Sequence, residues 1–322
     1  MAGKENGRMK AAVLIRAAGL SAALLMTSLA HGAIGDASLV LGDQARGLRS
    51  LVEAAGVMKD APYQYRWANF QGAAPLFEAQ RADAVDTSYA GDLPILMAAA
   101  GGVDFKLIQT NVGYAQSNGI IVPKDSPLHS IRQLQGQTVV VSSARGSISQ
   151  NLLYAALQEA GLQREDVQIQ FVMPTDASAA FNTGRVAAWA VFDPYLGVAE
   201  QNGARLLRDG QGLTPSLGFL TATTRSLADP DKRAAIKDFA ERVAKARQWA
   251  LDNPEEYAKV YARLTRLPLD TARRIASRTS KGVHSVSQQD IDRLQPVADL
   301  FYQLKILPNP VQVGALVDKS LR

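Results

Sequence analysis

The chain of 322 residues contains no cysteine. A disulfide framework, a thiolate nucleophile and a lipid-modified cysteine near the N-terminus are therefore all excluded. A protein without disulfides has to be stabilised by its own hydrophobic core. Hydrophobic residues make up 47% of the sequence, which is enough to build one.

Histidine is nearly as scarce. Only His129 and His284 follow residue 32, and both lie in polar, loop-like sequence. Metal sites need clustered histidine, cysteine and carboxylate ligands, and nucleophilic sites need a base beside the nucleophile. Neither pattern is visible here, so we expect no metal, no cofactor and no catalytic residues.

The N-terminus has the pattern of a secretory signal. Four basic residues precede the apolar run 17–30, and Ala30 or Gly32 offers a small residue for cleavage. The run is shorter than the ~20 apolar residues that a membrane-spanning helix needs. We therefore predict a signal peptide over 1–32 and a soluble periplasmic protein of a Gram-negative bacterium that is not a lipoprotein.

The charge of the remaining chain is close to neutral. The formal charge of +5 drops to about +2 once the four basic residues and one acidic residue of 1–32 are removed. Scattered charge of this size gives no basic patch for nucleic acid. About 290 residues remain, and a chain of that length usually divides its core between two domains.

Short β-rich runs alternate with amphipathic helical patterns, which predicts an α/β architecture with largely parallel sheets. We expect the chain to cross between two domains on strands, because no flexible linker is present. The candidates for crossing are 119–124 and the region before 218. The predicted strands are 38–43, 63–70, 84–88, 105–111, 119–124, 137–143, 167–173, 188–193, 204–209 and 218–224.

Helices fill the gaps and dominate the C-terminal part. The spacing predicts a helix over 147–161, ended by a glycine at its last position. A long helix follows residue 228, and Pro254 then starts another one at its first turn. A last helix begins near Ser287 and contains Pro296, which should kink it.

The segment 137–153 places a tight turn and a helix start directly after a strand. Free backbone amides at the start of a helix favour an anion, and Arg145 could add a two-pronged hydrogen bond. The alternative is a capping box in which Ser147 and Gln150 satisfy the same amides internally. The spacing alone favours neither.

Two further strand ends have the same character. In 188–195, Trp189 and Asp193 share one strand face near a carboxyl end, but position alone favours a core tryptophan and a helix cap. In 85–94, a glycine-containing loop with Ser88 precedes a helix that Asp92 could cap. If these three junctions come from two lobes, they would face one another across a groove.

Three stretches resemble a known family. They are FQGAAPLFEAQRADAVDTSYAGDLP (70–94), VPKDSPLHSIRQLQGQTVVV (122–141) and DASAAFNTGRVAAWAVFDPYLGVAEQNGARLL (176–207). They are similar to signature segments of the NMT1-like periplasmic solute-binding proteins of ABC importers for aliphatic sulfonates, taurine and nitrate. The similarity extends over essentially the whole chain after the signal.

The resemblance implies a type II periplasmic-binding fold, with two α/β lobes joined by two crossing segments. The first lobe would comprise 33–120 and 216–322, and the second 121–215. A monomeric receptor of this kind would close on a small organosulfur anion and deliver it to an inner-membrane permease, with no reaction catalysed. Taurine, nitrate or a thiamine-precursor pyrimidine are the alternative ligands, and an enzyme of the same fold is the rival class.

The resemblance also implies a set of ligand-binding residues. Arg145, Asn118 and the amides at 147–148 would hold the oxyanion, Trp189 would pack on the carbon part of the ligand, and Asp193 would read a polar group or lock closure. The full set is Gln44, Ser88, Gly91, Asp92, Asn118, Arg145, Gly146, Ser147, Ile148, Trp189 and Asp193.

The sequence departs from the family pattern at six positions, and these departures leave the exact substrate open. They are Ala73, Ala74, Asp83, Gln150, Ala187 and Phe192.

Overall fold

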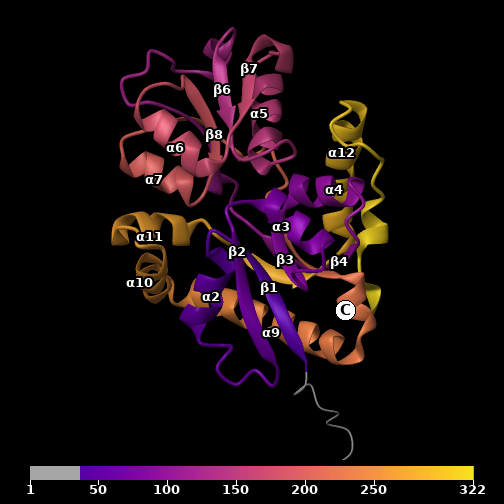
Figure 1. Cartoon of the computed structure of the whole chain (residues 1–322). Helices are drawn as coiled ribbons and strands as arrows, with labels where there is room; N and C mark the ends of the chain where they lie inside the picture. Colours follow the sequence, from indigo (N-terminus) through magenta and orange to yellow (C-terminus); the bar gives the residue numbers. More distant parts are fainter. Residues whose placement is uncertain (1–36, 322) are drawn as a thin grey trace, which may run out of the picture.

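A computed structural model describes residues 37–321, so the predicted signal peptide over 1–32 lies outside the described residues. Two α/β lobes lie one above the other, each built on its own sheet (Figure 1). Among the described helices, none combines the length and the hydropathy needed to cross a membrane.

The sheet of the first lobe has six strands in the order β11-β4-β10-β3-β1-β2. Strand β1 runs parallel to β2 and β3, whereas β10 is antiparallel to β3 and β4, and β11 to β4. The strands are β1 (Ser38–Gln44), β2 (Gln64–Phe70), β3 (Thr87–Gly91), β4 (Phe105–Val112), β10 (Leu217–Thr223) and β11 (Gly282–Ser285).

The sheet of the second lobe has five strands in the order β7-β6-β8-β5-β9. Strand β6 is parallel to β7 and β8, and β5 is antiparallel to β8 and β9. The strands are β5 (Asn118–Val122), β6 (Thr138–Val141), β7 (Gln168–Phe171), β8 (Ala188–Phe192) and β9 (Arg205–Asp209).

The pairing of β5 corrects one predicted boundary. All of β5 belongs to the second sheet, so the expected division at 120/121 cuts through a strand. The chain crosses earlier, over 113–117, between β4 and β5, and it returns over 210–216 before β10. The run 119–124 is expected to be a crossing strand because no flexible linker is present, but residues 118–122 form β5, which pairs with β8 and β9 inside the second sheet.

Helices cover both sheets. In the first lobe they are α2 (Gly47–Ala55), α3 (Ala73–Arg81), α4 (Asp92–Ala100), α8 (Thr224–Ala228), α9 (Pro230–Asp252), α10 (Pro254–Thr265), α11 (Leu269–Ser277) and α12 (Gln288–Gln303). In the second lobe they are α5 (Ile148–Glu159), α6 (Pro174–Asn182) and α7 (Tyr195–Gln201). Short 3₁₀ turns lie at Ala115–Ser117, Ile131–Leu134, Arg164–Asp166, Val313–Leu316 and Lys319–Leu321.

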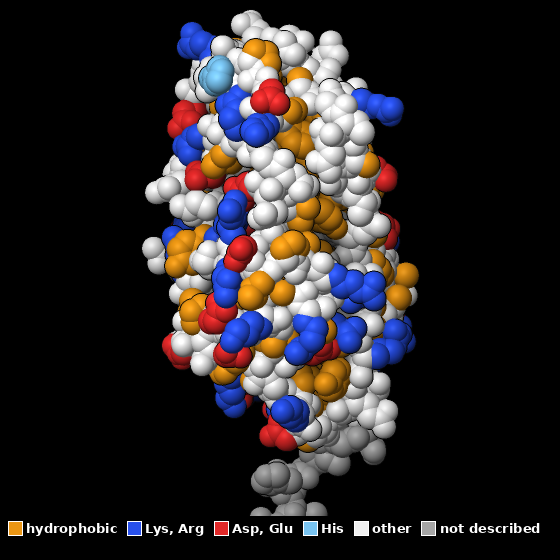
Figure 2. Space-filling view, turned by 90° about the vertical axis from the view of Figure 1, so that its left-hand side faces the viewer, with side chains coloured by type: hydrophobic (Ala, Val, Ile, Leu, Met, Phe, Trp, Pro, Cys, Tyr) orange, Lys and Arg blue, Asp and Glu red, His pale blue; other side chains and the backbone are white. Residues whose placement is uncertain are grey.

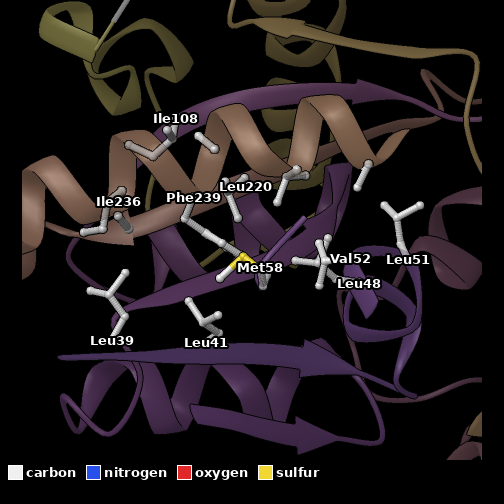
Figure 3. Close-up of a cluster of buried hydrophobic side chains, with 14 of the residues drawn as sticks. Leu39, Leu41, Leu48, Leu51, Val52, Met58, Ile108, Leu220, Ile236 and Phe239 are labelled. Carbon is white, nitrogen blue, oxygen red and sulfur yellow. The ribbon is translucent and has the colours of Figure 1, made fainter. Parts of the chain in front are cut away.

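The long helix α9 packs its apolar stripe on the first sheet. Phe239 from α9 lies among Leu39 and Leu41 of β1 and Leu220 of β10 (Figure 3). Each such side chain, when fully buried, contributes roughly 1.5–3 kcal/mol relative to exposure. This packing fixes the direction of α9, and it therefore determines where the C-terminal turns of the helix lie relative to the strand ends.

Most predicted helix boundaries agree with the structure. Ser147 caps α5, Pro254 is the first residue of α10, and Ser287 caps α12, which contains Pro296. Strand β3, however, begins three residues later than predicted and continues to Gly91, which was expected in a loop. The backbone of Gly91 is extended and pairs with Gly218 of β10, so tertiary pairing decides this segment rather than the glycine.

Candidate ligand-binding cavity between the lobes

A cavity of about 380 Å³ lies between the two lobes. The residues that end β1, β3, β6 and β8, or follow them, all contribute to its wall, as do the two crossing segments. Carboxyl ends of strands are the usual place for ligands in open α/β sheets. Because both lobes supply wall residues, any ligand held there would contact both of them.

Nine of the eleven predicted site residues line this cavity, and two do not. The nine are Gln44, Gly91, Asp92, Asn118, Arg145, Gly146, Ser147, Ile148 and Asp193. Trp189 and Ser88 point elsewhere.

The expected role of Trp189 at the ligand was wrong. The side chain is fully buried in the core of the second lobe, where its ring packs at a tilt against Phe181 and its indole N–H donates to Ser142 Oγ at 2.8 Å. The face that Trp189 shares with Val191 is covered by core residues of α6 and α7. Alternation along a strand identifies two faces, but it does not say which of them meets a helix and which meets a cleft.

Ser88 is displaced for a related reason. It is fully buried on the other face of β3, while its neighbour Tyr89 lines the cavity. Successive side chains of a strand alternate, so only one of the two can face the cavity. The structure therefore places Tyr89, and not Ser88, at the cavity.

The start of α5 is partly capped by side chains and partly free to bind an anion, so both interpretations of its sequence apply. Ser147 Oγ accepts from the amide of Gln150 at 3.2 Å, and the Gln150 side chain accepts from the amide of Gly146 at 2.6 Å. The amides of Ile148 and Ser149 have no acceptor among the described residues. The cap thus satisfies part of the helix end and leaves two amide donors free.

Asn118 fixes this turn in place. Its Nδ2 donates to the carbonyl of Ile148 at 2.9 Å, and its Oδ1 accepts from Ser149 Oγ at 3.2 Å. Both polar atoms of Asn118 are therefore engaged in joining β5 to the start of α5. In this arrangement Asn118 orients the start of α5, where Ile148 lines the cavity.

Arg145 lines the cavity but is exposed. Its guanidinium lies 5.5 Å from the centre of the Phe171 ring in the same lobe, where a cation–π contact favours it. The guanidinium of Arg145 therefore lies at the solvent-exposed rim of the cavity and not in its buried interior.

A second arginine was missed. Arg247 from α9 is only 4% exposed, lines the cavity and stacks its guanidinium 5.5 Å from the centre of the Tyr89 ring. Its Nε has no hydrogen-bond partner, and no carboxylate of the described residues lies within ion-pair distance. A signal was available, since position 247 continues the buried spacing of Ile236, Ala240 and Val243 along the helix.

Buried carboxylates surround the same space. Burial raises the pKa values of Asp43, Asp92 and Asp193 to about 6. Each already has a partner in the protein: Asp43 accepts amide N–H groups at the start of α2, and Asp92 accepts the amide of Leu93. Asp193 is paired with an arginine that comes from the other lobe. The three carboxylates therefore already have hydrogen-bond or ion-pair partners within the protein.

Three tyrosines, Tyr89, Tyr257 and Tyr261, complete the wall near Arg247. Burial raises the pKa of each phenol above its usual value, and the Arg247 charge opposes that rise at Tyr89 and Tyr257. The phenols stay protonated at neutral pH and can donate hydrogen bonds. A buried cation beside neutral donors is a favourable environment for an anion and a poor one for a cation.

The two histidines of the described residues, His129 and His284, are not among the residues that line this cavity. His284 Nε2 is 2.9 Å from Asp290 Oδ2, a carboxylate that also accepts from Ser287 at the start of α12. Within residues 37–321 no group of three or more histidine, cysteine, aspartate or glutamate side chains is placed to hold a metal ion.

Comparison with known proteins agrees with this geometry. The profile of the NMT1/THI5-like family matches residues 78–257, more than half of the chain. The chain belongs to this family. It is 30% identical over 249 residues, 77% of each chain, to an aliphatic sulfonates-binding protein from Escherichia coli (strain K12). It is also 30% identical over 258 residues to one from Bacillus subtilis (strain 168), covering 79% of this chain and 76% of that one.

Solved structures of this family have the same architecture. The alkanesulfonate-binding protein SsuA from Xanthomonas axonopodis pv. citri, bound to MOPS, has a TM-score of 0.81 at 29% identity, covering 88% of this chain and 98% of that chain. SsuA from Escherichia coli has a TM-score of 0.77 at 27% identity with the same coverage. The predicted periplasmic-binding-protein fold is therefore confirmed. The desulfurization enzyme DSZB, at 14% identity and a TM-score of 0.64, shares the fold alone.

Proposed function

We propose that this protein is the periplasmic substrate-binding receptor of an ABC importer and that it binds a small organosulfur anion, an aliphatic sulfonate or a related sulfate ester, between its lobes. The named relatives are sulfonate-binding proteins, and the chain covers about three quarters of their length. The receptor would pass its ligand to an inner-membrane permease. We further propose that it acts as a monomer after removal of residues 1–32 and catalyses no reaction.

The observation that carries this proposal is Arg247. A charged group buried without a partner costs several kcal/mol, and proteins retain such a group only where something compensates it. The oxygens of a sulfonate can accept two parallel hydrogen bonds from the planar guanidinium, and neighbouring phenols can donate further ones. The ligand anion would therefore supply the partner that the described residues do not.

The second lobe would contact the other side of the same anion. The free amides of Ile148 and Ser149 lie at the N-terminus of α5, where the partial positive charge of the helix favours an anion. A ligand held by Arg247 from one lobe and by these amides from the other would bind the closed arrangement better than an open one. Differential affinity of this kind is what drives closure.

The test is a ligand screen by thermal shift followed by calorimetry, in a buffer free of sulfonates. Methanesulfonate, ethanesulfonate, taurine, MOPS and an aryl sulfate would be compared with nitrate and a thiamine-precursor pyrimidine. A ligand at 100 times its Kd adds about 2.7 kcal/mol of stability. We expect sulfonates or sulfate esters to give the largest shifts, and a shift confined to nitrate or the pyrimidine would overturn the proposal.

The rival function is an enzyme of the same fold, because the desulfurization enzyme DSZB shares this architecture. The structure of one DSZB variant carries a cysteine-to-serine change and a bound sulfinic acid. This chain has no cysteine with which to match such a residue. Incubation with the tightest sulfonate, followed by assay for sulfite release, separates the two classes, since a receptor returns its ligand unchanged.

A further inference from the structure

The two lobes touch through paired fits in which a side chain of one lobe meets a glycine of the other. Gly91 in the first lobe faces Ile148, and Gly72 faces Ser143. In the second lobe Gly146 faces Met97. At each position a Cβ atom would collide with the opposite lobe, so the approach of the lobes depends on these glycines.

A contact of the same kind occurs on α7, where the glycine itself does not line the cavity. Gly197 faces Ile275 of α11, and a Cβ at 197 would lie 2.7 Å from Ile275 Cγ1 and 3.0 Å from Cδ1. Helices α7 and α11 belong to different lobes and pack side by side (Figure 1). The backbone of Gly197 is not in the left-handed region, so the helix backbone itself tolerates alanine there. Besides Ile275, an added Cβ would meet Asp193 Oδ1 of the same lobe at 3.3 Å, which is a less severe contact.

An ion-pair cluster joins the lobes beside this contact. Arg278, which follows α11, donates to Asp193 at 2.6 and 2.9 Å and to Glu200 of α7 at 2.8 and 3.3 Å. The three side chains are only 11–14% exposed. The outer surface over α7, α10 and α11 shows acidic and basic groups interspersed rather than separated by sign (Figure 2).

We propose that this seam, formed by Gly197, Ile275, Arg278, Asp193 and Glu200, sets how closely the lobes approach and thereby sets ligand affinity. Gly197, Glu200 and Arg278 are positioning residues, because they do not line the cavity. The claim about affinity rests on the proposed receptor function, whereas the claim about closure does not.

The principal test is a double-mutant cycle on Gly197 and Ile275. Gly197→Ala should weaken MOPS or ethanesulfonate binding about tenfold or more, since overpacking of a tight contact is strongly unfavourable. Its unfolding midpoint should be unchanged or higher, because alanine favours the helix. In the Ile275→Ala background, Gly197→Ala should weaken ligand binding far less than it does in the wild type, when the double variant is compared with Ile275→Ala alone. Gly314→Ala, where a Cβ meets nothing within 4 Å, is the control.

Closure itself is measured without relying on any ligand. The chain has no cysteine, so dyes attached at Lys59→Cys and Asp176→Cys, exposed positions in different lobes, report the distance between the lobes by single-molecule FRET. Gly197→Ala should shift the distribution towards larger separations, and Ile275→Ala should reverse the shift. The proposed role of the seam would be wrong if Gly197→Ala left the distribution of distances between the lobes unchanged. It would also be wrong if the effect of Gly197→Ala persisted in full in the Ile275→Ala background. Failure of the wild type to bind any sulfonate would instead contradict the proposed receptor function. The FRET comparison would still test whether the seam controls closure.

Discussion

Two arginines of the first lobe, Arg247 and Arg278, are largely shielded from solvent, and their surroundings are opposite. Arg247 lies in the cavity wall with aromatic neighbours and no carboxylate partner in the described chain, whereas Arg278 lies in the seam between two carboxylates. The charge of Arg278 is already balanced by carboxylates of the protein, whereas that of Arg247 would be balanced by a bound anion. This contrast separates Arg247, which would bind the ligand, from Arg278, which joins the lobes.

The largest expected effect follows removal of the unpaired charge. Arg247→Met should weaken sulfonate binding by about a hundredfold or more, since a charge-assisted hydrogen-bond pair and its buried setting are both lost. Without ligand the variant should be as stable as the wild type or more stable, because an uncompensated buried charge is gone. Calorimetric titration and urea unfolding measure the two quantities. Arg247→Lys keeps the charge and serves as the matched control, with an intermediate loss.

Removal of the paired arginine should reverse this pattern. Arg278→Met leaves Asp193 without a cationic partner and leaves Glu200 with Arg274 alone, at 3.7 Å, so the free energy of unfolding should decrease by about 2–4 kcal/mol. Urea unfolding without ligand measures it, and adding Asp193→Asn should restore part of the loss. If Arg278→Met left stability unchanged while Arg247→Met reduced it, the contrast between the two arginines would be wrong.

Arg145 should have a smaller role than the sequence suggests. Its guanidinium rests on Phe171 at the exposed rim, so Arg145→Ala should weaken sulfonate binding by about tenfold at most. Calorimetry under the conditions used for Arg247→Met gives a direct ranking of the two side chains. A loss at 145 larger than that at 247 would move the anion towards the second lobe.

The smallest effect concerns pH. Burial raises the pKa of Asp43 from 3.8 to about 6, so the folded protein takes up a proton between these values that the unfolded chain does not hold. The contribution of Asp43 to the free energy of unfolding therefore increases as the pH is lowered from about 7 to 5, by at most about 1.4 kcal/mol per pH unit. Urea unfolding at pH 5, 6 and 7 should show a weaker dependence in Asp43→Asn than in the wild type. Equal slopes would contradict this assignment.

The sequence was a good guide wherever a local pattern determines the structure. Ser147 with Gln150 predicted the start of α5, and the strand-to-helix junctions together with the family resemblance identified nine cavity residues. It was a poor guide where packing between distant segments decides. Trp189 could face a helix or a cleft with the same alternation, and β5 could end one lobe or begin the next with the same apolar run.

Arg247 and Arg278 illustrate the same limit. Both lie on or after helices far along the chain from the strand ends they approach, and nothing in their neighbouring residues says that one meets two carboxylates and the other none. The spacing on α9 could have marked position 247 as buried, but the missing partner is visible only once the lobes are assembled.

The most direct test of the account is a crystal structure with 2-bromoethanesulfonate, whose bromine and sulfur can be located independently by anomalous scattering. The account predicts the sulfonate between the lobes, with two of its oxygens within hydrogen-bond distance of the Arg247 guanidinium and the third near the amides of Ile148 and Ser149. A sulfonate seated outside this cavity, or inside it with Arg247 left unengaged, would contradict the central claim.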